Sequence, residues 1–227
     1  SGTVVTTASL AEDLRRRGRN NVVLSRNSTL GMPALPGPRH DHDELRVLYM
    51  GNIGRAQRLA TAIDAVAAAA ERGVRVHLRI VGSGAQLAPL RRYARRLGDQ
   101  VSFIERIPHD EVIDQYAWAD TVLVILRDWE AMKLTVPSKL YEVLQVGRHV
   151  SVSAAGETAE IVQQAQAGHA VAPQDPAALA SLWLRLAADR RLLDIGCSGQ
   201  EWIAAHDHPR DQARAVDALL RHLVAEP

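Results

Sequence analysis

The first residues that could do chemistry are two lysines in a chain that otherwise uses arginine. Of its 27 lysine and arginine residues, only Lys133 and Lys139 are lysines, and both lie close to Pro137. Pro137 fits the first position of a helix, because a proline lacks the N–H group that would have no partner there. Lys139 then falls in the first turn, where the helix dipole makes a cation unfavourable by about 0.3–1 kcal/mol. We interpret Lys139 as a phosphate-binding residue, since an anion in front of the helix would reverse that cost.

A carboxylate accompanies this lysine. Glu142 lies three residues after Lys139, so both side chains project from the same side of the predicted helix. Two interpretations stay open for Glu142. Its carboxylate either pairs with Lys139 within the helix or accepts hydrogen bonds from the two hydroxyl groups of a ribose.

A glycine-rich turn at 49–59 leads from a predicted strand into a predicted helix. Gly51 and Gly54 would let backbone amides approach a ligand closely, and the helix start behind them favours an anion. Arg55 adds a guanidinium group that can bind a phosphate through two hydrogen bonds. The alternative is a tight turn with a solvated arginine.

Two further helix starts have the same character. In the turn at 80–87, Gly82 and Gly84 surround Ser83, which could cap the next helix. Near residue 156, Gly156 turns the chain and Glu157 opens a helix, where its main expected role is to compensate the helix dipole and contact with a ligand is the alternative. The helix starts behind the turns at 49–59 and 80–87, together with the one at Pro137, predict a site for a nucleoside diphosphate.

Short β-branched segments alternate with amphipathic helices along most of the chain. This alternation predicts an α/β fold in which helices cover both faces of a parallel sheet. Such a sheet binds its ligand beyond the carboxyl ends of its strands, which is where the glycine turns fall. The predicted strands are 22–25, 45–50, 74–81, 101–104, 121–126, 149–153 and 169–172. The predicted helices are 57–72, 85–97, 109–118, 137–146 and 157–167, with a helical region from residue 176 onward.

The chain divides at a segment rich in proline and glycine. Residues 27–44 form the predicted linker, which separates a small piece at 1–26 from a compact unit at 45–205. A terminal helix is expected at 206–227.

The composition is that of a globular protein with a hydrophobic core. Apolar residues make up 47% and charged residues 23%, as expected for a chain with a sizeable core. A net charge of +1 gives no overall field for nucleic acid or an anionic membrane. The single cysteine fits a reducing compartment, and we expect neither a signal peptide nor a membrane span.

Six segments of the chain, taken in their order, are more specific than any single motif. GNIGRAQRLATAIDAV, IVGSGAQLAPLRRYA, VSFIERIPHDEVIDQYAWADTVLVIL, VPSKLYEVLQVGRHVSVS, GETAEIV and AGHAVAPQDPAALASL follow one another over about residues 46–205. They resemble the C-terminal, donor-binding half of glycosyltransferase family 4 enzymes of the GT-B fold, and most of all the bacterial branch that makes surface polysaccharides. The resemblance implies a Rossmann-like three-layer α/β/α domain with a mostly parallel sheet. It also implies that residues 1–26 are the end of an N-terminal GT-B domain.

The resemblance assigns roles to the residues named above. Arg55, Lys139 and Glu142 are the implied catalytic residues, of which the first two would hold the diphosphate and Glu142 would bind the ribose. The backbone near Arg106 and Ile107 would read the base. The remaining implied contacts are Gly51, Asn52 and Gly54 in the first loop, Gly82, Ser83 and Gly84 beneath the base, Pro137 and Ser138 at the diphosphate, and Gly156 and Glu157 near the donor sugar.

Two departures from the family pattern are visible. The first glutamate of the paired motif should lie eight positions before Glu142, where this chain has Leu134. Glu130 and Lys133 are the candidates to replace it. The usual lysine shortly after Arg55 is also missing, and Arg58 or Lys139 could supply its charge.

The expected function is therefore donor binding in a retaining glycosyltransferase that needs no metal or other cofactor. The expected donor is a UDP-sugar, and the expected acceptor is a glycan or a lipid-linked molecule. The other GT-B domain would bind the acceptor, so this chain alone would turn over little substrate. We expect a cytoplasmic protein, with peripheral association at the inner face of the cytoplasmic membrane left open. Two alternatives remain: a GT-B nucleotide-sugar 2-epimerase and a non-catalytic nucleotide-binding module.

Overall fold

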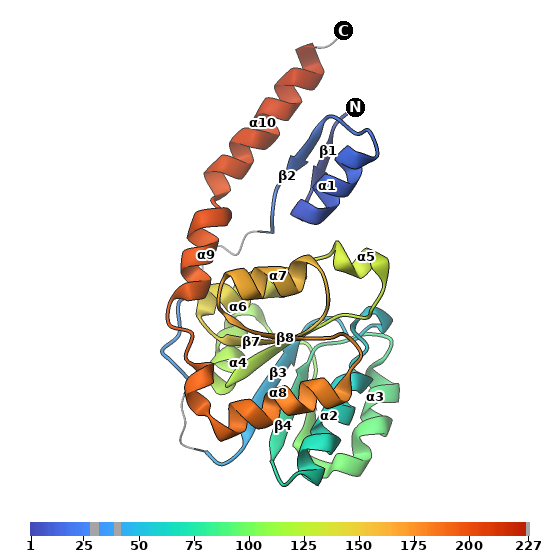
Figure 1. Ribbon diagram of the computed structural model, residues 1–227, viewed down its shortest axis with the longest axis vertical. Coiled ribbons are helices and arrows are strands. Elements are labelled where there is room, and N and C mark those ends of the chain that lie inside the picture. Colours follow the sequence, from blue (N-terminus) through green and yellow to red (C-terminus); the bar gives the residue numbers. More distant parts are fainter. Residues whose placement is uncertain (28–31, 39–41, 226–227) are drawn as a thin grey trace.

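The computed structural model describes residues 1–27, 32–38 and 42–225 (Figure 1). The predicted linker at 27–44 therefore lies partly outside the described residues, at 28–31 and 39–41.

The main unit is a six-stranded parallel sheet, as the alternating pattern predicted. Its strand order is β5-β4-β3-β6-β7-β8. From β3 the chain moves outward to β5, then returns to place β6 on the other side of β3. The sheet therefore has its topological switch point between β3 and β6, the place where open α/β sheets bind ligands. The strands are β3 (Leu45–Met50), β4 (Val76–Val81), β5 (Val101–Ile104), β6 (Thr121–Ile125), β7 (His149–Ser153) and β8 (Gly168–Val171).

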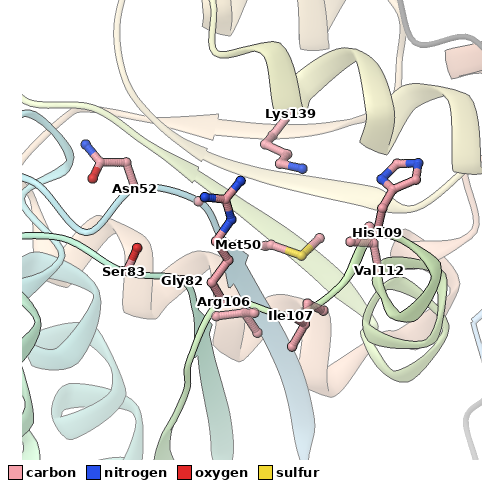
Figure 2. Close-up of a pocket in the computed structure, with 11 residues that line it drawn as sticks. Met50, Asn52, Gly82, Ser83, Arg106, Ile107, His109, Val112 and Lys139 are labelled. Atoms are coloured by element: carbon pink, nitrogen blue, oxygen red, sulfur yellow. The ribbon is translucent and has the colours of Figure 1, made fainter.

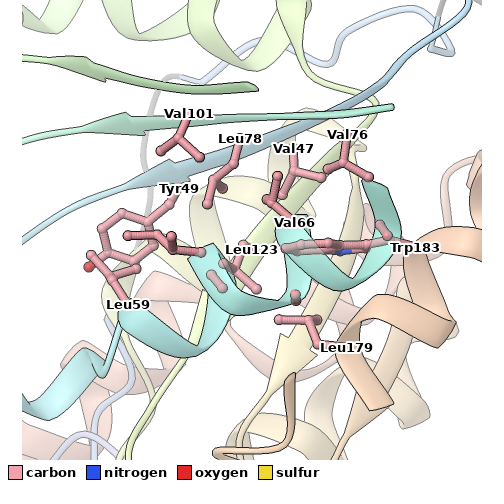
Figure 3. Packing of buried hydrophobic residues seen from close by; sticks show 14 of the residues in the cluster. Val47, Tyr49, Leu59, Val66, Val76, Leu78, Val101, Leu123, Leu179 and Trp183 are labelled. Atoms are coloured by element: carbon pink, nitrogen blue, oxygen red, sulfur yellow. The ribbon is translucent and has the colours of Figure 1, made fainter. Parts of the chain in front are cut away.

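Helices cover both faces of this sheet, which confirms the predicted three-layer architecture. Alternate residues of a strand point to opposite faces, so Val47 joins one core and Leu48 the other. The first core, shown in Figure 3, packs the sheet against α2 (Ala60–Glu71), α3 (Leu87–Ala94) and α8 (Pro176–Ala188) and buries Trp183 completely. The second core lies beneath α4 (Val112–Trp118), α6 (Ser138–Val146), α7 (Glu157–Gln164) and α9 (Ser198–His206).

Short helical elements complete the main unit. They are α5 (Glu130–Lys133) and the 3-10 turns η1 (Arg55–Gln57), η2 (Arg95–Gln100), η3 (His109–Glu111) and η4 (Arg190–Leu193). No helix in the described part of the chain is long and apolar enough to cross a membrane.

Two predicted helix starts are wrong in detail. Pro137 is the cap of α6 and not its first residue, so Ser138 begins the helix. Ser83 does not cap α3, which begins at Leu87 after Gln86. The cause of the second shift is a contact between loops: the Gln86 amide donates to the Ile53 carbonyl at 2.9 Å, which holds the preceding residues in a turn.

A smaller unit precedes the main one. β1 (Thr3–Val5), α1 (Ala8–Arg16) and β2 (Val22–Leu24) form a two-stranded parallel sheet with its own helix. The last helix, α10 (Pro209–Ala225), runs from the main unit alongside β2 (Figure 1). That this unit is the end of a larger N-terminal domain stays a prediction.

Candidate functional site

A cleft of about 410 Å³ opens at the carboxyl ends of β3, β4 and β5 (Figure 2). Its walls come from the two glycine turns, the loop after β5 and the start of α6. These segments are distant in sequence, and the sheet brings them to one edge. The lining residues are Met50, Gly51, Asn52, Val81, Gly82, Ser83, Arg106, Ile107, His109, Val112 and Lys139.

Gly51 and Gly82 hold the floor of the cleft together by direct backbone contact. Gly82 has a φ of +141°, and a Cβ atom there would lie 1.9 Å from the Gly51 carbonyl oxygen. The Gly51 amide donates to the Val81 carbonyl at 2.9 Å, and the Gly82 amide donates to the Ile104 carbonyl at 3.0 Å. Both amides are therefore used inside the protein, so side chains and other loop amides must meet a ligand in the cleft.

Gly54 and Gly84 belong to the same pair of turns. The Gly54 amide donates to Gln57 Oε1 at 3.1 Å, so it too is used internally. A Cβ atom on Gly84 would lie 2.4 Å from the Ile53 carbonyl oxygen, which makes Gly84 a second point of close approach between the turns.

Lys139 extends into the cleft from the first turn of α6 (Figure 2). Its Nζ atom lies 2.9 Å from Glu142 Oε2, and the Tyr116 hydroxyl donates to the same oxygen at 3.0 Å. Burial raises the pKa of Tyr116, followed by the effect of Glu142, so this phenol stays protonated and able to donate. The intrahelical Lys–Glu pair is thus observed. Glu142 does not line the cleft, and its contact with a ribose stays a prediction.

Pro137 and Ser138 lie immediately before Lys139, so the start of α6 points toward the same region. The Leu140 amide donates to the Pro137 carbonyl at 2.9 Å. The amides of Ser138 and Lys139, at the first two positions of the helix, could donate to an anion held by Lys139.

Arg55 lies in a second, smaller pocket of about 90 Å³ on the other side of the first glycine turn. This pocket also contains Gly54, Arg58 and Arg127. Among the described residues, no carboxylate lines either the cleft or this pocket. Both are therefore suited to an anionic ligand.

His109 is a cleft residue that the sequence interpretation missed. It follows Pro108 at the end of the loop that carries Arg106 and Ile107, begins η3, and lies beside Val112 of α4 at the cleft (Figure 2). The position of this loop after a predicted strand was the available signal. Met50, Val81 and Val112 were missed as well, because apolar residues in or beside core elements carry no mark of a binding role.

Gly156 and Glu157 lie outside this cleft and contact other parts of the chain. A Cβ atom on Gly156 would lie 2.2 Å from the Lys133 carbonyl oxygen. The Glu157 carboxylate accepts hydrogen bonds from the amides of Ala8 and Ser9 at 2.9 and 2.7 Å. Arg26 Nη1 lies 2.7 Å from the same carboxylate. Glu157 therefore holds the small N-terminal unit at the start of α1, and its predicted contact with a donor sugar stays untested.

The candidates to replace the missing glutamate at Leu134 lie at the surface. Lys133 Nζ pairs with Glu130 Oε1 at 2.6 Å, and neither residue lines the cleft or the pocket. The Leu134 carbonyl instead accepts a hydrogen bond from the Thr7 hydroxyl at 2.7 Å, a second link to the N-terminal unit.

Replacing Glu157 with glutamine is expected to loosen the N-terminal unit. Burial raises the pKa of Glu157, but hydrogen bonds from Ser9, Ala8 and Arg26 outweigh burial and leave the pKa lowered. Its stabilising contribution is therefore complete above the ordinary carboxyl value of 4.5 and is lost as the pH falls below it. We expect a loss of roughly 1–3 kcal/mol, because the variant leaves half-buried donors poorly matched.

Amide hydrogen exchange at Ala8 and Ser9 measures this effect. The protection factors of these two amides, which correct for the slower intrinsic exchange at low pH, should fall in Glu157→Gln at neutral pH and in the unmodified chain below pH 4.5. Glu160→Gln on the exposed side of α7 is the matched control. Unchanged protection in the Glu157 variant would show that the carboxylate does not hold the unit.

The sequence comparison gives one family. The model of the family described as "Glycosyl transferases group 1" matches residues 44–189. No curated protein matches the chain in sequence.

Solved structures match over nearly the whole chain. A TarM mutant from S. aureus, in complex with fondaparinux, alpha-GlcNAc-glycerol and UDP, has a TM-score of 0.78 at 14% identity, covering 96% of this chain and 43% of that one. Sucrose-phosphate synthase from Thermosynechococcus elongatus has a TM-score of 0.71 at 25% identity, covering 99% and 58%. HepE from Anabaena, in complex with UDP-glucose, has a TM-score of 0.76 at 15% identity, covering 99% and 64%. These likenesses show the fold of one half of a GT-B protein, and this chain spans about half the length of the structures it matches.

Proposed function

The chain belongs to the group 1 glycosyl transferases, and on that premise we propose that it binds the nucleoside diphosphate sugar donor of such an enzyme. The single observation that carries the proposal is the cleft at the carboxyl edge of the sheet, which Lys139 and Arg106 line without any carboxylate among its described residues. A nucleoside fits the apolar side of the cleft at Met50, Val81 and Val112. Its diphosphate then reaches Lys139 and the start of α6.

The same proposal assigns stabilisation of the leaving group to the positive charges of the site. When the bond between the donor sugar and the diphosphate breaks, negative charge develops on the departing phosphate. Fixed cations and the amides of a helix start stabilise such charge without having to reorganise. Lys139 and Arg55 are the side chains to which we assign this role, and Glu142 would bind the ribose while also positioning Lys139.

UDP is the donor nucleotide we favour. TarM and HepE were solved in complexes that contain UDP or UDP-glucose, and both share the fold of this chain. We further propose retention of configuration, departure of the phosphate without a metal ion, and a glycan or lipid-linked acceptor bound by a second, N-terminal domain. A cytoplasmic site of action belongs to the same proposal.

Titration calorimetry of the 227-residue chain with UDP, GDP, ADP and uridine tests this function. We expect UDP to bind most tightly, at least about tenfold more tightly than uridine, because charged hydrogen bonds to the diphosphate contribute roughly 1.5–3 kcal/mol each. A folded chain that binds none of the diphosphates, or binds UDP no better than uridine, would refute the proposal.

A further inference from the structure

The small pocket beside the cleft is lined by three arginines from two segments of the chain. Arg55 and Arg58 follow β3, whereas Arg127 follows β6. These two strands flank the topological switch point. The pocket therefore lies where the order of an open α/β sheet favours a ligand.

Nothing within the described residues neutralises these three charges. Their side chains form no ion pair or hydrogen bond there, and Arg127 only lies over the ring of Trp129, at 4.7 Å from its centroid. Other arginines of this chain do find acidic partners, as Arg190 does with Asp120 at 2.8 Å. Like charges around one small pocket repel one another, and a bound anion would remove that repulsion.

The backbone holds the two segments against each other. The Arg127 amide donates to the Ala56 carbonyl at 2.7 Å, which fixes the end of β6 to the turn after β3. Arg58 has a φ of +47° and a ψ of +45°, a left-handed conformation that is uncommon for a side chain of its size. Strained backbone of this kind is frequent at ligand sites.

The cleft and the pocket share one wall. Gly51 and Asn52 line the cleft, and Gly54 and Arg55 in the same turn line the pocket. A ligand that extends from the cleft past this turn therefore brings its far end to the arginines. With about 90 Å³ of space against 410 Å³ in the cleft, the pocket suits one small anionic group and not a second nucleoside.

We propose that Arg127 is a phosphate-binding residue which, with Arg55 and Arg58, holds the terminal phosphate of the nucleoside diphosphate. This inference rests on the proposed function, because it takes the nucleoside to lie in the cleft. It adds a residue from the β6 side of the switch point to a site otherwise built from the β3 side and from α6. Arg127 contributes charge and two parallel hydrogen bonds to the phosphate at which the leaving group forms.

The test compares UDP with UMP on the Arg127→Gln variant. We expect UDP affinity to fall by about 10- to 100-fold, the effect of losing one charged hydrogen-bonding group, whereas UMP affinity should change by less than about threefold. The thermal unfolding temperature should change little, because within the described residues the replaced side chain makes no hydrogen bond or ion pair, and its guanidinium lies over the ring of Trp129, which is itself 43% exposed.

Arg95→Gln is the matched control. It removes the same charge from an exposed position in η2, which leads into the amino end of β5 at the opposite edge of the sheet. Equal losses of UDP affinity in both variants would mean that only the overall charge matters, and would overturn the inference. An unchanged UDP affinity in Arg127→Gln, or equal losses for UDP and UMP, would overturn it as well while leaving the proposed function intact. If the unmodified chain binds no diphosphate, the proposed function fails first and this inference fails with it.

Discussion

Replacing Lys139 with alanine is expected to weaken the binding of a nucleoside diphosphate by roughly 10- to 100-fold, the effect of one lost charged hydrogen bond. Lys139 lines the cleft, and its position in the first turn of α6 adds its charge to the positive end of the helix dipole. Folding should hardly change. The pair with Glu142 is partly exposed, and such pairs contribute about 0–1 kcal/mol. Titration calorimetry with UDP measures the loss.

Lys133→Ala is a closely matched control for this variant. Lys133 is the other lysine of the chain, and it also pairs with a glutamate three positions away, Glu130 at 2.6 Å. It lines neither the cleft nor the small pocket that contains Arg55, Arg58 and Arg127. We therefore expect Lys133→Ala to bind UDP like the unmodified chain. Equal UDP affinities in the two lysine variants would show that Lys139 does not bind the phosphate.

Replacing Gly82 with alanine is expected to destabilise the main unit by roughly 3 kcal/mol or more and to distort the floor of the cleft. The added Cβ atom would lie 1.9 Å from the Gly51 carbonyl oxygen, a backbone atom that cannot rotate away. The two turns must separate to relieve this overlap, which breaks their hydrogen bonds and moves both walls of the cleft. Chemical unfolding followed by circular dichroism measures the stability, and calorimetry with UDP measures the site.

Gly73→Ala separates backbone strain from the steric overlap. Gly73 also has a positive φ, +76°, but nothing lies within 4 Å of its added Cβ atom. We expect this control to cost only about 1 kcal/mol, from strain alone, and to leave UDP binding unchanged. A Gly82 variant as stable as the Gly73 variant would show that the two turns are not tightly coupled.

Local pattern in the sequence predicted the elements of this fold well. The mostly apolar segment at 45–50 and the amphipathic helices between the strands form from residues that are neighbours in the chain, so the pattern of apolar residues was enough to identify them. The two glycine turns were also predictable, because they follow strands and must meet at the carboxyl edge of a parallel sheet. Lys139 stood out for the same local reason, as a cation where a helix start disfavours one.

Only the tertiary structure decided which partners these residues meet. Glu157 is acidic at a helix start in the sequence, yet its carboxylate binds Ser9, which is 148 positions away. Arg127 carries no motif, and it joins Arg55 because β6 returns to lie beside β3. Such contacts follow from the order of strands in the sheet. That order is set by packing over the whole core, which no short segment of the sequence records.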